Sequence, residues 1–437
     1  MFGRLRQIGL ILLVLFATGP GLAHGQLPLP VTPPRLPVDT VQDMTRDTLD
    51  QTNRTLEDVR AADLRDLLRQ NRDVLERGPR QSVIVRREII AFAPSESLVG
   101  AAEALGFRVL RQDMLPGLGT PIVVFEPPER WSTRRALRRL QSLDGNGVFD
   151  FNHIYSASGQ GRLAMRPPAV QEAFVGSRLR LGIIDTGIAQ AHPALQASRL
   201  TTRAFGGLGY VPAQHGTQVA SLAVGHAGDF RAPAAGAEIF SADVYGDAVT
   251  GGNAEALARA LGWMAEENVA VINISVVGPP NRILEAVVRQ MTDRGHIIVA
   301  AVGNDGPTAP PLYPAAYDGV IGVTAVGMSG RVIPEAARGD QVDVAAPGAA
   351  MVAASLDGSF AEIRGTSFAA PLVSGLLAHQ LSLPDPVSAS AAIRYMEAEA
   401  RDAGRHGRDQ VYGVGIMAEA YRFNAITMTA QSRPSEN

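Results

Sequence analysis

The chain has 437 residues, of which 46% are hydrophobic and 19% are charged. This composition is typical of a globular protein and excludes a chain that is disordered throughout. The formal net charge of −3 leaves no overall basic field, so we expect no nucleic-acid partner. The sequence contains neither Cys nor Lys, which excludes disulfides, thiol catalysis, Cys-ligated metal sites and Lys-based catalysis.

The N-terminus has the pattern of a secretory signal peptide, which we predict for residues 1–25. Arg4 and Arg6 precede an apolar run from Ile8 to Ala17, and small residues follow up to Gly25. The run is short for a transmembrane helix. We therefore expect a secreted protein, periplasmic or extracellular if the source is bacterial, with no membrane attachment after signal cleavage.

Three segments follow the predicted signal peptide. Residues 26–39 are Pro-rich and predict an extended linker. Residues 40–78 are dense in Asp, Glu and Arg, with loosely spaced apolar residues, and predict a charged helical segment. Residues 82–155 predict a small unit with the element order βαββαβ, which is the ferredoxin-like order. Its expected elements are strands at 83–93, 107–114, 122–126 and 148–155, and helices at 95–105 and 132–143.

The rest of the chain predicts one larger domain between two polar segments. Residues 156–171 predict an exposed connector, residues 172–427 an α/β domain, and residues 428–437 a tail. Expected strands lie at 179–184, 238–244, 269–274, 296–301, 320–326 and 342–345, and expected helices at 218–224, 254–267, 282–294, 368–379 and 387–399. These strands are nearly continuous apolar runs, which indicates a mostly parallel sheet with helices on both faces. Ligands of such sheets bind at the carboxyl ends of the strands.

Three short motifs in this domain carry residues suited to chemistry. Asp185 ends an apolar strand in Asp-Thr-Gly, His215 opens His-Gly-Thr, and Ser367 lies in Gly-Thr-Ser before a helix of small residues. Taken alone, each residue could have a purely structural role: Asp185 as a turn residue, His215 as a residue at a helix start, and Ser367 as a helix cap.

The three residues together point to nucleophilic catalysis. Asp, His and Ser in this chain order form one of the arrangements that build a Ser-His-Asp triad on unrelated folds. A Ser hydroxyl becomes a useful nucleophile when a base takes its proton, and His, which titrates near neutrality, can take the proton and return it. A carboxylate holds the imidazole in the required tautomer.

The domain resembles the subtilisin family of serine peptidases over residues 179–423. The resemblance rests on the three motifs and on supporting stretches at 272–275, 300–304, 313–315, 344–348 and 412–415. It implies a catalytic triad of Asp185, His215 and Ser367, with Asn304 as the oxyanion-hole side chain. It further implies substrate-binding roles for Ser275, Gly278, Ala301 and Gly303. An amide donor just after a strand is also what a developing alkoxide requires, although without the other motifs a turn residue would be the favoured interpretation of Asn304.

The resemblance implies a precursor whose ferredoxin-like unit is a pro-domain that inhibits the enzyme within the molecule. We expect a secreted serine endopeptidase that acts on protein or peptide substrates through an acyl-enzyme. We also expect it to cut itself between Tyr155 and Val170, with Tyr155 to Gly161 favoured. The alternative function is a pseudoenzyme or a retained inhibitor–protease complex that acts as a binding or regulatory protein.

Three positions depart from the family pattern. Gln218 replaces a second His, and the substrate-edge segment reads Ser275-Val-Val-Gly278. The connection from His226 to Ala237 has one acidic residue, Asp229, which gives poor support for a structural calcium site. We expect no metal among the site residues and no cofactor for the chemistry.

Overall fold

The computed structural model of the chain describes residues 62–157, 160–165 and 178–423. The predicted signal peptide, the Pro-rich linker and the tail lie outside the described residues. Within the predicted charged helix, residues 62–70 are helical, but Leu75–Arg77 form strand β1. The prediction is wrong at that end because Leu75 is buried and pairs with Val85 of the next strand.

The N-terminal unit, defined here as residues 75–153, has the predicted βαββαβ order after β1. Its elements are β2 (Val83–Phe92), α2 (Glu96–Ala104), β3 (Arg108–Leu115), β4 (Thr120–Glu126), α3 (Thr133–Leu143) and β5 (Val148–His153). The antiparallel strands lie in the order β5-β2-β4-β3, which is the ferredoxin-like arrangement. Ser95 and Ser132 begin the two helices by accepting hydrogen bonds from backbone N–H groups of the first turn.

A parallel sheet of seven strands forms the centre of the larger domain, in the order β17-β16-β15-β13-β8-β12-β9. Its strands are β8 (Arg180–Asp185), β9 (Leu200–Ala204), β12 (Glu238–Asp243), β13 (Val271–Ile274), β15 (Ile297–Ala301), β16 (Val320–Val326) and β17 (Val344–Pro347). The main helices are α4 (Gln214–Val224), α5 (Ala254–Glu266), α6 (Arg282–Asp293), α7 (Ala370–Leu377) and α8 (Pro386–Glu399). The mixed α/β fold with a mostly parallel sheet is the predicted one.

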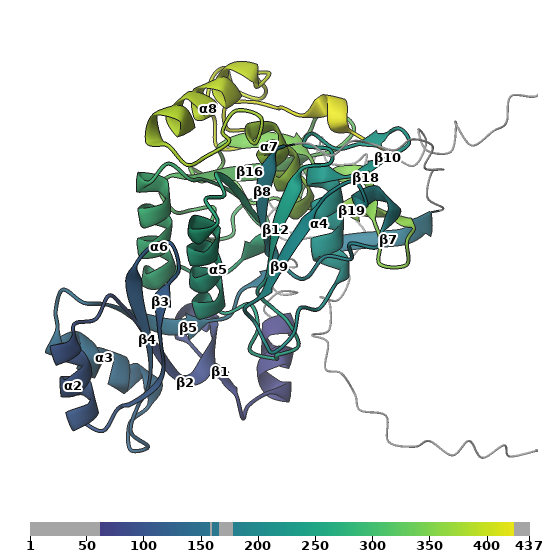
Figure 1. The fold of residues 1–437 in the computed structure, drawn as a ribbon. Coiled ribbons are helices and arrows are strands. Elements are labelled where there is room, and N and C mark those ends of the chain that lie inside the picture. Colours follow the sequence, from purple (N-terminus) through teal and green to yellow (C-terminus); the bar gives the residue numbers. More distant parts are fainter. Residues whose placement is uncertain (1–61, 158–159, 166–177, 424–437) are drawn as a thin grey trace, which may run out of the picture.

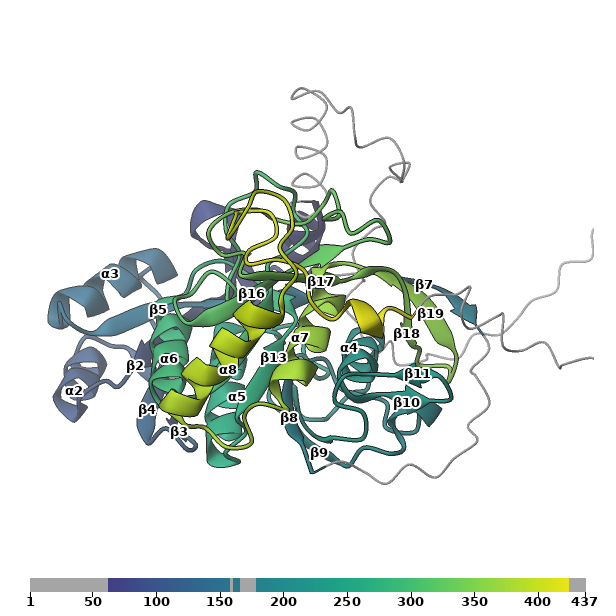
Figure 2. The ribbon, with the colours of Figure 1, turned by 90° about the horizontal axis from the view of Figure 1, so that it is seen from above.

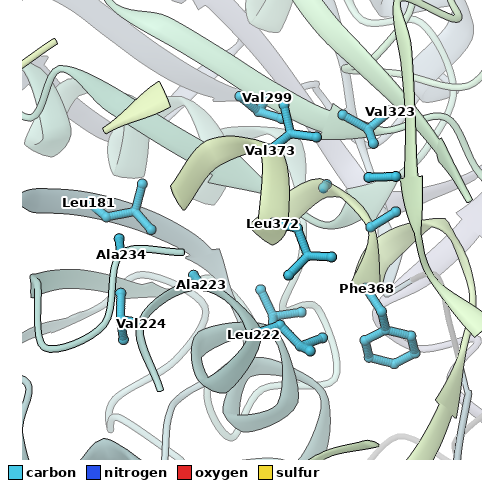
Figure 3. Close-up of a cluster of buried hydrophobic side chains, with 14 of the residues drawn as sticks. Leu181, Leu222, Ala223, Val224, Ala234, Val299, Val323, Phe368, Leu372 and Val373 are labelled. Carbon is cyan, nitrogen blue, oxygen red and sulfur yellow. The ribbon is translucent and has the colours of Figure 1, made fainter. Parts of the chain in front are cut away.

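Alternation along the strands divides this domain into two apolar cores. Leu181 and Ile183 of β8 join the core under α4 and α7, whereas Ile184 joins the core under α5 and α6. Successive side chains of a strand point to opposite faces, so one short apolar run supplies both layers. Figure 3 shows the first core, where side chains of α7 lie between those of α4 and of the sheet.

The N-terminal unit packs against the outer side of α5 and α6 (Figures 1 and 2). Its own core takes Ile89 and Ala91 of β2, while the intervening Ile90 belongs to the core of α5 and α6. Ile122 and Val124 of β4 lie on that same shared face. The sheet of the N-terminal unit is therefore covered on one side by α2 and α3 and on the other by the larger domain.

The part of the predicted exposed connector that the structure describes forms two short strands, which we did not predict. Ser156–Ala157 form β6, which pairs with β14 (Val276–Val277), and Gln160–Met165 form β7, which pairs with β19 (Phe360–Arg364). These short polar strands find partners more than a hundred residues away, so the local sequence carries no sign of the pairing.

Several other elements differ from the prediction. Helix α4 begins at Gln214, one turn before the expected start, so His215 lies inside the helix. The helix expected at 368–379 is divided into the 3-10 turn η4 (Thr366–Phe368) and α7. Edge strand β9 and the hairpin of β18 (Ala349–Ala354) with β19 were not expected, nor was the short hairpin of β10 (His226–Ala227) and β11 (Phe230–Arg231).

Candidate active site

Asp185 and His215 meet at the carboxyl end of strand β8. The His215 Nδ1 lies 2.8 Å from Oδ1 and 3.0 Å from Oδ2 of Asp185, and Asp185 is fully buried. An ionised carboxylate only accepts hydrogen bonds, so Nδ1 is the donor and carries the proton. The contact leaves Nε2 as the basic nitrogen of the ring.

The two motifs around this pair are bonded to each other. The Thr186 N–H donates to Asp185 Oδ1 at 2.7 Å, and Thr186 Oγ1 accepts from the Gly216 N–H at 2.8 Å. A Cβ atom at Gly216 would lie 2.2 Å from the Thr186 carbonyl oxygen, so only glycine fits after His215. Thr217 Oγ1 accepts from the Ala189 N–H at 3.0 Å. Each motif residue thus fixes the position of the first turn of α4 against the end of β8.

Ser367 lies in the tight turn η4, directly before α7. Gly365 has a φ of +142°, which other residues rarely adopt. Ser367 Oγ donates to the Ser275 carbonyl at 3.2 Å, and Ser275 Oγ donates to the Ser367 carbonyl at 3.0 Å. The residue that caps α7 is Ala369, so Ser367 is not the N-cap of that helix. The ring of the next residue, Phe368, lies 5.6 Å from the His215 ring, which brings the serine turn beside α4.

Asn304 lies on the loop that follows β15 and is bonded to the serine turn. Its Oδ1 accepts from the Thr366 N–H at 3.0 Å, and Thr366 Oγ1 accepts from the Gly303 N–H at 3.2 Å. The first bond orients the amide with its oxygen toward the turn. Thr366 is a residue that sequence reasoning missed, although it stands within the Gly-Thr-Ser motif.

The four expected substrate-binding residues lie in different settings. Ser275 bonds directly to Ser367, and Gly278 pairs with Tyr313 through two backbone bonds of 2.9 and 3.0 Å. Gly303 accepts the Ala337 N–H through its carbonyl. Ala301 is the last residue of β15 and is fully buried.

A segment of the chain itself lies along the edge formed by these residues. Strand β6 pairs antiparallel with β14, and the Tyr155 N–H donates to the Gly252 carbonyl at 2.7 Å. The Tyr155 ring covers Gly278, where a Cβ atom would lie 2.3 Å from the ring, and its hydroxyl donates to the Pro279 carbonyl at 2.8 Å. Burial raises the pKa of Tyr155 well above its usual value, so the hydroxyl stays neutral.

Two further properties of the described residues bear on function. In this part of the chain, no group of three or more His, Cys, Asp or Glu side chains could hold a metal ion. None of the helices that the structure describes is long and apolar enough to cross a lipid bilayer.

A parallel α/β sheet with Asp, His and Ser at adjoining strand and helix ends defines the class of serine peptidases whose triad runs in this order. The sequence model of the subtilase family, Peptidase_S8, matches residues 176–415. The chain belongs to the subtilase family and is a subtilisin-like serine peptidase.

Individual relatives agree with this assignment. Subtilisin E of Bacillus subtilis is 29% identical over 280 residues, which cover 60% of this chain and 71% of that protein. The minor extracellular protease Epr of the same species is 28% identical over 263 residues, which cover 58% of this chain and 40% of Epr. Fervidolysin of Fervidobacterium pennivorans, a keratinolytic enzyme, shares the fold with a TM-score of 0.62 and 18% identity, over 76% of this chain and 60% of its own.

Proposed function

We propose that the chain is the precursor of a secreted endopeptidase whose triad is Asp185, His215 and Ser367. The observation that carries the proposal is the buried Asp185–His215 bond beside the turn of Ser367. In this mechanism, His215 Nε2 takes the proton of Ser367 as the hydroxyl attacks the peptide carbonyl, and later gives it to the leaving amine. Asp185 keeps Nδ1 protonated and stabilises the imidazolium.

Asn304 completes the proposed site as the side-chain donor to the developing oxyanion. Its Oδ1 is bonded to the Thr366 N–H, so the amide is already oriented before substrate binds. The second donor is the Ser367 N–H. Donors that are fixed in advance stabilise the charge of the transition state without a reorganisation cost, typically by about 3–4 kcal/mol for one donor.

The substrate is a protein or peptide that binds as an extended strand. The support is the pairing of β6 with β14 and of Tyr155 with Gly252, which leaves the chain segment between two backbone edges. Backbone pairing recognises any peptide in the extended conformation, while pockets for alternate side chains add selectivity. Ser275 and Gly278 border this path, and Ala301 and Gly303 lie on the strand and loop behind Asn304.

The N-terminal unit acts in this proposal as an inhibitor within the same molecule. It is bonded to the first turns of both helices that it covers: Asn152 Oδ1 accepts the Glu255 N–H at 3.1 Å, and Asp150 Oδ2 accepts the Arg282 N–H at 2.9 Å. Backbone N–H groups at helix starts have no partner within their own helix. With the unit in position, its last strand leads Tyr155 into the substrate path.

We further propose that the precursor cuts itself between Tyr155 and Val170, with the stretch from Tyr155 to Gly161 favoured, and that residues 1–25 direct it out of the cell. Neither chemistry nor maturation requires a cofactor in this proposal. The extracellular relative Epr is consistent with export.

The test compares the full-length chain with its Ser367→Ala variant, expressed and purified away from host proteases. We expect the unmodified chain to lose its N-terminal unit and to hydrolyse casein, and the variant to stay uncut and inactive. Mass spectrometry of the N-terminus locates the cut. A variant that still hydrolyses casein removes Ser367 from the mechanism. An unmodified chain that is exported, folded and permanently uncut supports the alternative of a binding or regulatory complex.

A further inference from the structure

A second buried carboxylate stands next to Asp185. Asp243 is the last residue of β12, and the parallel register of the two strands pairs it directly with Asp185. Both side chains are fully buried. Neighbouring strands lie about 4.8 Å apart, and paired residues point to the same face of the sheet. The proposed triad therefore has a second acid beside its own aspartate, for which no sequence motif gave a sign.

The carboxylate of Asp243 accepts three backbone hydrogen bonds. The Val211 N–H donates to Oδ2 at 2.8 Å, and the N–H groups of Tyr245 and Gly246 donate to Oδ1 at 3.0 and 2.8 Å. Burial is the largest influence and raises the pKa of Asp243 above its usual value; the three donors only partly offset this, and the charge of Asp185 adds to the rise. Donors on both oxygens favour the ionised form, because a protonated carboxyl would face an N–H with its own O–H.

The three bonds join two segments that carry the proposed site. Val211 leads into α4, where the Ala213 N–H donates to the Gly187 carbonyl, and His215 follows two residues later. On the other side, Tyr245 Oη donates to the Tyr155 carbonyl at 3.3 Å. Asp243 thus lies between the segment that positions the imidazole and the segment beside the substrate path.

On the basis of the proposed triad, we propose that Asp243 is a positioning residue of this peptidase. Its buried negative charge acts through Asp185 and strengthens the hold of His215 on the proton taken from Ser367, and its three bonds fix the segments on either side.

The other titratable groups near Asp243 in the described part of the site are either neutral or at the surface. Asp243 is therefore the group that places a second buried charge beside Asp185. The Tyr210 hydroxyl faces the same region but is neutral, since burial raises its pKa to about 12, and it is bonded to Ser241 Oγ at 2.8 Å. Arg203 on β9 pairs with Glu266 at 3.2 Å at the surface. Asp247 lies in the next turn and is exposed.

The test is the Asp243→Asn variant, made in the full-length chain and allowed to mature. Removing a negative charge beside Asp185 lowers the proton affinity of His215. The acid limb of the profile of kcat/KM against pH therefore moves to lower pH. On the plateau, kcat/KM falls about tenfold, because an amide nitrogen replaces one acceptor of a buried charged hydrogen bond. A purely structural role would lower the plateau and the thermal stability but leave the acid limb in place.

Asp247→Asn is the matched control. Asp247 Oδ1 accepts the Leu208 N–H at 3.0 Å, so it carries the same charge and holds the same loop, but at the surface. Any shift of its acid limb should be smaller than that of Asp243→Asn and should vanish in concentrated salt, which screens exposed charges more than buried ones. Equal shifts in both variants would overturn the proposal.

Two further outcomes decide the matter if Asp243→Asn does not fold. Asp243→Ser is also neutral and should move the limb in the same direction. In the unmodified enzyme the acid limb should keep its position as salt is raised, and a limb that moves strongly would place the controlling charge at the surface and overturn the proposal. Hydrolysis by the Ser367→Ala variant would instead refute the proposed triad, which keeps the two failures apart.

Discussion

Two contacts of the larger domain are built in different ways. The first joins α4 and α7 to the sheet, and we call it the core contact. The second joins α5 and α6 to the N-terminal unit, and we call it the docking contact. The first is filled by apolar side chains such as Leu222, Leu372 and Val373 (Figure 3). The second combines apolar residues of β2 and β4 with buried charges and bonded helix starts. An apolar contact is costly to expose to water, whereas the polar groups of a contact can bond to water when it opens. We therefore expect the core contact to be permanent and the docking contact to be able to dissociate.

The polar part of the second contact centres on Arg111. Its guanidinium donates to both carboxylate oxygens of Glu255, at 2.7–3.1 Å, and to Glu88 at 2.8 Å. Asn152 Nδ2 also donates to Glu88, at 2.8 Å. The side chains of Glu255 and Glu88 are 7% and 12% exposed, so they depend on this arginine for compensation.

A substitution in the core contact should have the largest effect on stability. Leu372→Ala in α7 removes buried methyl groups and leaves a cavity, so we expect a loss of about 2–5 kcal/mol in the free energy of unfolding. Denaturant unfolding of the Ser367→Ala precursor measures it, since that background is not expected to digest itself. Leu383→Ala is the matched control, because Leu383 is 58% exposed and should change the free energy by less than about 0.5 kcal/mol.

A substitution in the docking contact should weaken the binding of the N-terminal unit more than it weakens folding. Arg111→Met leaves Glu255 and Glu88 without their partner, and truncation of one member of a buried ionic network costs about 2–5 kcal/mol. We therefore expect the cut N-terminal unit to dissociate at protein concentrations about thirtyfold to four thousandfold higher than in the unmodified chain. Dissociation is measured as the protease activity that appears when the matured chain is diluted.

The control for Arg111→Met is Arg108→Met on the same strand. Arg108 pairs with Glu126 within the N-terminal unit, and its side chain is 71% exposed. Surface pairs contribute about 0–1 kcal/mol, so docking should hardly change. If both variants released the unit equally, the Arg111 network would not be what holds it.

The same contact should open in acid through His153. Asn281 caps α6 by accepting the Ile283 and Leu284 N–H groups through Oδ1, so its Nδ2 faces His153 Nδ1 at 3.0 Å. That nitrogen must accept, and a proton on it would oppose the amide donor. Burial lowers the pKa of His153 from its usual 6.5, and Asp150 only partly opposes this.

The sign of the pH effect follows from that lowered pKa. The docked unit binds the proton less readily than the free unit, so docking is strongest above pH 6.5 and weakens as the pH falls below it, by at most about tenfold per pH unit. His153→Gln should lose this dependence, while His406→Gln, at an exposed surface pair, should keep it. Dilution assays at several pH values make the comparison, and an unchanged slope in His153→Gln would contradict it.

The two contacts also differ in how far the sequence could predict them. Apolar runs located every central strand of the large sheet. Short motifs singled out Asp185, His215, Ser367 and Asn304 as candidates, and the structure bonds Asp185 to His215 and Asn304 to the serine turn. Apolar runs could not predict β9, a half-exposed edge strand that contains Thr and Arg. A short segment that mixes polar and apolar residues in this way has the same pattern as a loop. Pairings such as β6 with β14 depend on residues far apart in the chain. Asp243 was hidden for the same reason, since its importance comes from the register of two parallel strands.

Metal removal should have the smallest effect, and the reason lies in a hairpin next to the permanent core. The connection from His226 to Ala237, with Asp229 as its acidic residue, forms β10 and β11, and Phe230 packs between Phe360 and Phe423 with ring centroids 5.0 Å apart in each case. Aromatic packing therefore stabilises this connection, where a calcium site would need six to eight oxygen ligands. We expect EDTA to lower the Tm of the Ser367→Ala precursor by less than about 2 °C, whereas Phe230→Ala should cost about 3–5 kcal/mol. A large fall in Tm with EDTA that Ca²⁺ restores would show that an ion, and not Phe230, holds the fold together there or elsewhere.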